Sequence, residues 1–145
     1  MRLVLQRVTA ASVRVGEELV GAIGPGLLVL VGVGRDDTHP IARRLARKVA
    51  AQRIFPDPAG RMNVSLLEIE GSALVVSQFT LYGETRKGNR PSFVAAAPPD
   101  LAVGVLAAFV SELRFLGVEV EEGRFGAHME VSLVNDGPVT ILMEV

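Results

Sequence analysis

The stretch Ala73-Leu74-Val75-Val76-Ser77-Gln78-Phe79-Thr80-Leu81-Tyr82-Gly83 joins an aliphatic run to a short polar island. A strand that is buried on both faces reads as continuous aliphatic residues, so residues 73–79 are predicted to form an inner strand of a sheet. Polar groups at the end of such a strand are either hydrogen-bonded or free for a ligand. Strand ends held by a rigid scaffold often carry binding and catalysis, so this island is the first candidate site.

A second polar island, Asn135-Asp136-Gly137-Pro138-Val139-Thr140, follows the apolar run Val131-Ser132-Leu133-Val134. We predict two strands within residues 129–145, one on each side of this island. From the residues alone, a tight Gly-Pro turn is the simpler interpretation of the second island. A strand end whose side chains bond nearby backbone is the simpler interpretation of the first. A site made of backbone groups stays open for both, because strand-end amides can hold a developing oxyanion.

The remaining strands are predicted from alternation and from turn residues. Residues 2–9 and 12–15 have strand-like patterns, and a turn at 16–18 leads into 19–23. Gly24-Pro25-Gly26 breaks the chain before a fully buried strand at 27–33. A short strand is expected at 118–121, and residues 56–72 are expected to be loop-like.

Two helices are predicted from apolar stripes at helical spacing. The first begins near 36–40, where acidic residues would face the positive end of the helix dipole. The second is opened by Pro98-Pro99-Asp100 and closed by Gly117. The stripes comprise Ile41, Leu45 and Val49 in the first helix, and Leu101, Val105, Phe109, Leu113 and Leu116 in the second.

The order of strands and helices predicts an α+β fold. Strands and helices do not alternate regularly, as βαβ units would, so we expect a mixed or antiparallel, barrel-like sheet with two packed helices. At 145 residues the chain is expected to form one domain over 1–145. Edge strands need cover, and pairing across a two-fold axis would supply it, so a homodimer is predicted.

Composition excludes several classes of protein. The chain has no cysteine, so it has no disulfides, thiol nucleophile or cysteine-bound metal. Its two histidines and the lack of an acidic loop give no set of metal ligands, so no metal site is predicted. No signal peptide and no run of about 20 apolar residues is present, which predicts no membrane partner, and the lack of cysteine fits a reducing cytoplasm.

Catalysis by a side-chain triad is not favoured by the sequence. Ser77 or Thr80 would need a base to act as a nucleophile, and neither His39 nor His128 is tied to them by spacing. Gly32-Val33-Gly34 follows a predicted strand but lacks the third glycine and the lysine of a phosphate-binding loop, so a simple turn is expected there.

Two basic clusters could meet a polyanion, although the net charge of the chain is −1. Each cluster taken alone is most simply a solvated surface. The residues are Arg43, Arg44, Arg47, Lys48 and Arg53 in one cluster, and Arg86, Lys87 and Arg90 in the other.

The two islands closely resemble the signatures of the D-aminoacyl-tRNA deacylases. The family pattern SQFTLxG matches Ser77 to Gly83, and the pattern NxGPVT matches Asn135 to Thr140. The opening QRVxxASV matches residues 6–13, and the resemblance extends over essentially the whole chain. It implies the deacylase fold, a homodimer without cofactor, and tRNA as the partner.

The resemblance also implies a reaction and roles for residues. The family hydrolyses the ester that joins a D-amino acid to the terminal adenosine of tRNA, and clears glycine from alanine tRNA. Ser77, Gln78 and Phe79 would orient the ester, and Thr80 would line the pocket or act as nucleophile, while the ribose 2′-hydroxyl assists. A cis Gly137-Pro138 pair beside Asn135 would reach into the other subunit and exclude L-amino acids.

Phosphate contacts are expected from both basic clusters, above all from Arg86, Lys87 and Arg90, which flank the first island. Two other functions stay open from the sequence. One is a non-catalytic RNA-binding module with the same fold, and the other is a hydrolase of small esters.

Overall fold

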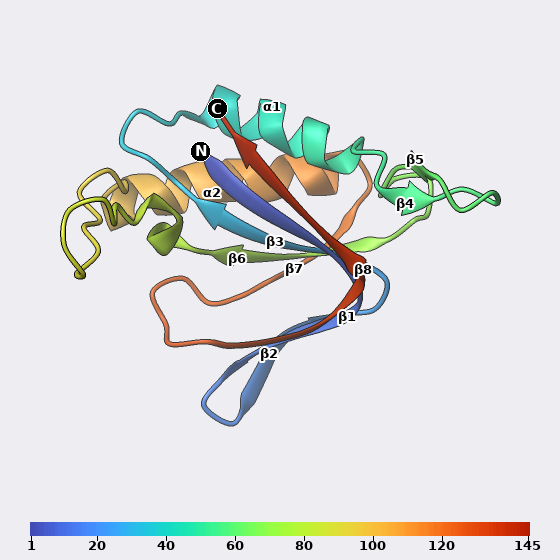
Figure 1. Cartoon of the computed structure of the whole chain (residues 1–145), viewed down its shortest axis with the longest axis horizontal. Helices are drawn as coiled ribbons and strands as arrows, with labels where there is room; N and C mark the ends of the chain where they lie inside the picture. Colours follow the sequence, from blue (N-terminus) through green and yellow to red (C-terminus); the bar gives the residue numbers. More distant parts are fainter.

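Strand β1 (Arg2–Val15) is the central strand of a six-stranded mixed sheet in the computed structural model, which describes residues 1–145 (Figure 1). It pairs antiparallel with β2 and β3 on one edge and with β8 on the other. The strand order is β2-β1-β3-β6-β7, and β3, β6 and β7 run parallel. The other strands are β2 (Glu18–Ile23), β3 (Gly26–Gly32), β6 (Ser72–Ser77), β7 (Glu119–Glu122) and β8 (Glu130–Glu144).

The sheet nearly closes into a barrel, because its two outermost strands approach each other. Gly21 in β2 lies so close to β7 that a Cβ atom there would come within 2.9 Å of the carbonyl oxygen of Glu122. A glycine is needed where backbone approaches backbone in this way. The predicted mixed, barrel-like sheet with two helices is confirmed.

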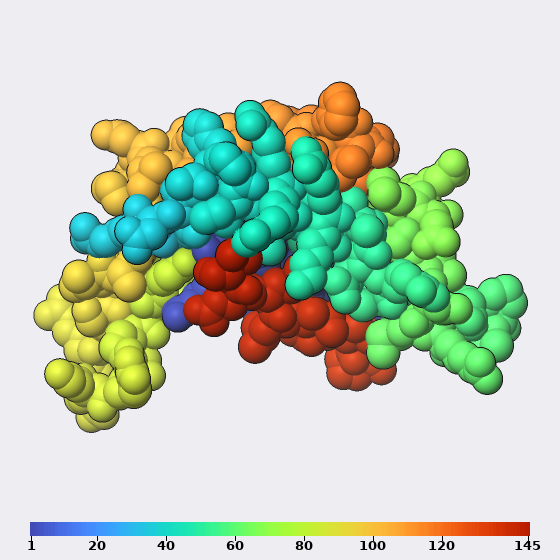
Figure 2. All heavy atoms as spheres, turned by 90° about the horizontal axis from the view of Figure 1, so that it is seen from above, coloured from blue at the N-terminus to red at the C-terminus, as the bar shows by residue number.

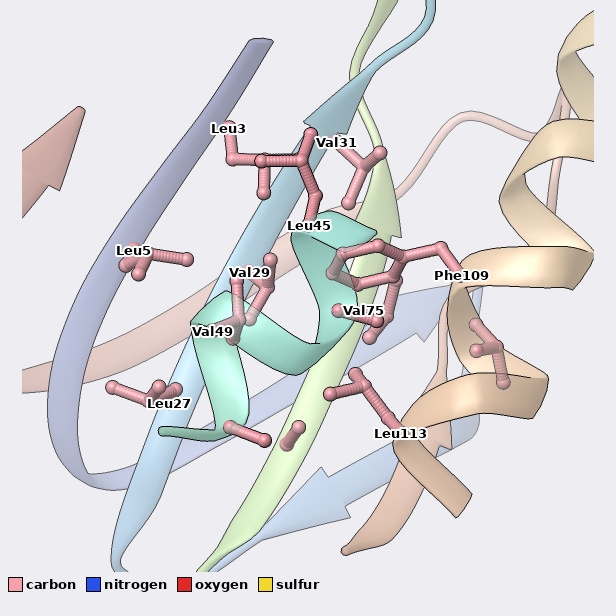
Figure 3. Packing of buried hydrophobic residues seen from close by; sticks show 14 of the residues in the cluster. Leu3, Leu5, Leu27, Val29, Val31, Leu45, Val49, Val75, Phe109 and Leu113 are labelled. Atoms are coloured by element: carbon pink, nitrogen blue, oxygen red, sulfur yellow. The ribbon is translucent and has the colours of Figure 1, made fainter. Parts of the chain in front are cut away.

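Helices α1 (His39–Ala50) and α2 (Pro99–Phe115) lie side by side over one face of the sheet (Figures 1 and 2). Their buried stripes, which include Leu45 and Phe109, pack on the aliphatic residues of β1, β3 and β6 (Figure 3). Both stripes match the predicted spacing. Neither helix combines the length and the apolarity needed to cross a bilayer.

Several predicted boundaries were wrong. Residues 2–9 and 12–15 form one strand, because the ladder with β8 continues across Ala10. Residues 129–145 likewise form one strand, β8, which is interrupted only by a bulge. The predicted loop 56–72 contains the end of a small hairpin, β4 (Phe55–Pro56) with β5 (Met62–Val64).

Candidate active site

Strand β6 ends at Ser77, and the chain then forms the short 3₁₀ turn η1 (Phe79–Tyr82). The amide of Gln78 still donates to the carbonyl of Val31 over 2.8 Å, but the amide of Leu81 turns back to the carbonyl of Gln78 over 3.2 Å. The prediction that the strand runs to residue 79 was therefore two residues too long. The amides of Phe79 and Thr80 have no acceptor within the turn, which leaves them available to a ligand.

A cavity of about 410 Å³ opens beside this strand end. Three phenylalanine rings from separate segments line it, and Phe79 meets Phe93 edge to face with ring centroids 5.1 Å apart. Most of its lining is apolar, and the exceptions come from the first island. The lining residues are Val31, Val33, Ser77, Gln78, Phe79, Phe93, Ala96, Ala97, Pro99, Ala102, Leu106, Phe125 and Gly126.

A smaller cavity of about 250 Å³ lies against the same strand end. It shares Ser77, Gln78 and Phe79 with the larger cavity and is otherwise lined by β6, β8 and the segment between β7 and β8. Three of the four residues predicted as catalytic thus stand between two hollows. This arrangement suits a bond held at Ser77–Phe79, with one part of a substrate in each hollow.

Thr80 occupies a different position from its three neighbours. Its side chain is exposed and lines neither cavity, and its hydroxyl accepts a hydrogen bond from the amide nitrogen of the Gln78 side chain. His128 lines the smaller cavity with Ser77, yet no hydrogen bond joins it to Ser77 or Thr80. The structure therefore contains no assembled hydroxyl–imidazole pair.

The second island is a wide bulge in β8. Asn135 pairs with Val8 and Thr140 pairs with Gln6, so residues 136–139 stand opposite Arg7 alone. Asn135 closes the bulge: its side-chain carbonyl oxygen accepts from the amide of Val139 over 2.7 Å, and its Nδ2 donates to Gln6 Oε1 over 3.1 Å. Asn135 is thus placed as a residue that shapes the bulge.

Arg7 lies opposite the bulge and fixes its backbone. It was not predicted as a site residue. It is almost fully buried, and its guanidinium donates to the carbonyls of Asp136 over 2.9 Å and Ile54 over 2.7 Å. A buried arginine with carbonyl partners fixes backbone position strongly. In the sequence, the signal for this role was an arginine at the inward-facing position that follows Leu3 and Leu5 in the alternation of the strand.

Gly137 and Pro138 stand exposed at the tip of the bulge, joined by a cis peptide bond. Gly137 has φ +143°, and a Cβ atom there would lie 2.7 Å from Val139 Cγ2, so this position requires glycine. No residue of 135–140 lines either cavity of the same chain. One protomer alone therefore does not bring the two islands together.

The basic loop after the first island has one paired and two unpaired cations. Arg86 donates from its backbone and its guanidinium to Glu84, and this hydrogen bonding lowers the pKa of Glu84 to about 2. Lys87 and Arg90 are exposed and form no ion pair. Of these three residues, which were predicted to contact phosphate, Lys87 and Arg90 have no acidic partner within the chain, whereas Arg86 is paired with Glu84.

Asp37 ties η1 to the loop after β3. Its carboxylate accepts from the Gly34 amide over 2.6 Å and from the Tyr82 hydroxyl over 3.3 Å, and it lies 2.5 Å from the Met1 amino nitrogen. Gly34 is needed for this packing, since a Cβ atom would lie 2.6 Å from the Tyr82 oxygen. The predicted turn exists here, but the acidic residues expected at the helix start precede α1: its first turn contains none, and the Asp37 carboxylate is buried in this network.

We expect Tyr82 to make the free energy of unfolding fall at high pH. Burial and the nearby Asp37 carboxylate raise the pKa of Tyr82 to about 12, above the value of about 10 of an unfolded chain. The stabilisation is complete below about pH 10 and is lost as the pH rises from about 10 through 12. Urea unfolding between about pH 8 and 12 should show a steeper decline for the wild type than for Tyr82→Phe. Parallel curves would contradict this assignment.

Comparison with known proteins places these features in one family. The model of the D-Tyr-tRNA(Tyr) deacylase family matches residues 4–144. The chain is 62% identical to a D-aminoacyl-tRNA deacylase of Roseiflexus sp. (strain RS-1) over 144 residues, which cover 99% of this chain and 93% of that protein. It is 57% identical to a D-aminoacyl-tRNA deacylase of Deinococcus deserti over 145 residues, which cover 100% and 99%.

Solved structures show the same fold. A structure described as a c-Myc DNA unwinding element binding protein superposes with a TM-score of 0.93 at 41% identity, covering 100% of this chain and 99% of that one. A probable eukaryotic D-amino acid tRNA deacylase shares the fold, with a TM-score of 0.86 at 21% identity over 99% and 98% of the two chains. On the full-length family match and these identities, the chain belongs to the D-Tyr-tRNA(Tyr) deacylase family of hydrolases.

Proposed function

We propose that this enzyme hydrolyses the ester between a D-amino acid and the 3′-terminal ribose of tRNA, with the scissile carbonyl held at Ser77, Gln78 and Phe79. The observation that carries the proposal is the aromatic cavity against this strand end, which has a second hollow beside it. Family membership supplies the substrate class. The reaction takes place in the cytoplasm, where aminoacyl-tRNA is made.

The larger cavity suits the terminal adenine. Proteins commonly hold unpaired RNA bases by stacking them on aromatic side chains. Phe79, Phe93 and Phe125 supply such surfaces in a hollow whose other lining residues are mostly apolar. With the base there, the ribose and its ester extend toward Ser77 and the free amides that begin η1.

The chemistry follows from the absence of an assembled base beside Ser77 or Thr80. Water adds to the ester carbon, the amides at the start of η1 stabilise the oxyanion, and the bond to the ribose 3′-oxygen breaks. The neighbouring ribose 2′-hydroxyl takes up the proton that the attacking water loses and donates its own proton to the leaving 3′-oxygen. The main contribution of the protein is to position the ester and the water. Holding reactants in a productive geometry by itself accelerates reactions strongly.

Two substitutions test whether the protein supplies a nucleophile or a base. We expect Thr80→Ala and His128→Asn to keep kcat for D-tyrosyl-tRNA within about tenfold of wild type, because neither side chain performs the chemistry. A general base contributes typically ~10²–10⁴-fold. A loss of that size for His128→Asn, or of several orders of magnitude for Thr80→Ala, in a variant that melts like wild type would overturn the positioning mechanism.

A homodimer completes the site in this proposal. The exposed tip Gly137-Pro138 lines no cavity of its own chain, and β8 is paired along one edge only. Val134 and Leu142 in the same strand expose 58% and 78% of their surface. Exposed apolar side chains on a strand with one free edge fit a second copy. The tip of each copy then guards the cavity of the other.

The tip selects by collision. An L side chain would meet the rigid Gly137-Pro138 wall, whereas a D side chain points elsewhere. Glycine has no side chain to collide, so glycyl-tRNA of alanine is also a substrate. A steric clash with the L form can separate two enantiomers that favourable contacts alone would distinguish poorly.

Side-by-side deacylation of D-tyrosyl-tRNA and L-tyrosyl-tRNA tests the function. We expect hydrolysis of the D form and of glycyl-tRNA of alanine, with little hydrolysis of the L form. A small-ester hydrolase would instead cleave simple acyl esters that lack adenosine, and an RNA-binding module would cleave none of these substrates. Either result would refute the proposal.

A further inference from the structure

The charged side chains on the solvent-facing side of α1 are all positive. Arg43, Arg44, Arg47 and Lys48 are all exposed, and their spacing of one and four residues places them on one face of the helix. Together α1 and α2 contain five Arg or Lys and two Asp or Glu residues, in a chain whose net charge is −1. We call these four residues the α1 basic face.

Most of this charge is uncompensated within the protein. Only Arg47 has an acidic partner, with its Nε 2.6 Å from an oxygen of the buried Glu112 in α2. Arg43, Arg44 and Lys48 form no ion pair. Like charges four residues apart, as in the pairs 43/47 and 44/48, destabilise a helix. A bound polyanion would relieve this repulsion.

The α1 basic face begins next to the candidate active site. Val33, which lines the larger cavity, lies six residues before His39, the first residue of α1. His39 packs near Gly104 in the half of α2 that lines the cavity, with its Nε2 3.3 Å from where a Cβ of that glycine would lie. From there α1 runs across the top of the molecule, as Figure 2 shows in teal. Arg43 lies about 6 Å along the axis from His39, at about 1.5 Å per residue.

We propose that the α1 basic face binds the phosphate backbone of the tRNA whose 3′ end occupies the cavity, an inference that rests on the proposed function. Three of its four cations are arginines, whose planar guanidinium pairs well with phosphate. The face extends away from the cavity, so it meets nucleotides that precede the terminal adenosine. An acidic protein is the competing partner, and the tests below separate the two.

The test compares two double variants that remove equal charge. Arg43→Gln/Arg44→Gln removes cations from the α1 basic face and leaves the Arg47–Glu112 pair intact. Arg14→Gln/Arg61→Gln, in β1 and in the turn before β5, removes two exposed cations elsewhere. Binding of uncharged tRNA is measured between about 50 and 300 mM KCl, a range over which phosphate contacts weaken strongly. Cleavage is measured on D-tyrosyl-tRNA and on the 3′-D-tyrosyl ester of adenosine.

We expect the α1 variant to bind tRNA about tenfold more weakly at physiological salt, with the slope of log Kd against log[salt] reduced by about 1–2. Its kcat/KM should fall on tRNA but not on the adenosine ester, while the control keeps both. Unchanged tRNA binding and salt slope would overturn the inference and assign the face to another partner. Equal loss in both variants would overturn it too, as an effect of net charge. Failure of the wild type to cleave the adenosine ester would instead count against the proposed function, because tRNA binding is measured separately.

Discussion

Replacing Ala102 by phenylalanine is expected to lower kcat/KM for D-tyrosyl-tRNA by about 10²–10³-fold, an effect with two contributions. Ala102 is half-buried in α2 and faces the larger cavity, so the added ring occupies the space assigned to the adenine. Loss of base stacking costs about 1–3 kcal/mol. A displaced ester adds to this loss, because a shift of about 1 Å can cost ~10²-fold.

The control for this experiment is Ala107→Phe, on the same helix but at an exposed position. It adds the same ring without filling the cavity and should leave kcat/KM near wild type. Because the cavity of about 410 Å³ can take the ring added by Ala102→Phe without displacing the core, both variants should melt near wild type. Full activity of Ala102→Phe in a folded protein would show that the base binds elsewhere.

Pro138→Ala is expected to reduce chiral discrimination more than any other surface substitution. The proline ring fixes one backbone dihedral and makes the tip rigid. Alanine leaves a smaller and softer tip, so L-tyrosyl-tRNA enters. The ratio of kcat/KM for the D form over the L form should fall to the ~10–200-fold that pocket contacts alone supply. It is measured by parallel deacylation of both substrates, with hydrolysis of the D form largely kept.

A mixed dimer tests whether the Gly137-Pro138 tip of one subunit acts on its own cavity or on the cavity of the other subunit. In a dimer of one Ala102→Phe and one Pro138→Ala subunit, the only working cavity belongs to the Pro138→Ala subunit. If the tip acts across the interface, the intact Pro138 of the other subunit guards this cavity and L-tyrosyl-tRNA is rejected again. Continued hydrolysis of the L form would mean that each tip acts within its own chain. A monomer with normal discrimination would refute the dimer proposal as well.

Periodicity predicted the elements of the fold because side-chain burial repeats with the geometry of each element. The stripes around Leu45 and Phe109 located both helices, and the run at 27–33 located β3. The predicted ends of strands were wrong where pairing with a distant segment determines how far a strand extends. The prediction left a gap at residues 10–11 between two strands, yet the ladder with β8 carries β1 through Ala10 and Ala11. Ladder partners from opposite ends of the chain leave no local trace in the sequence.

The sequence by itself determined the family, the two polar islands and the aliphatic strands that present them, because residue identity and local spacing are sufficient for these. Only the tertiary structure decided which contacts form around the two islands. It turned Asp37 inward, paired Arg86 with Glu84, set Arg7 beneath the Gly137-Pro138 bulge and joined three distant phenylalanines around one hollow. Each of these depends on contacts between segments far apart in the chain, and such contacts form only when the whole sheet and both helices have packed.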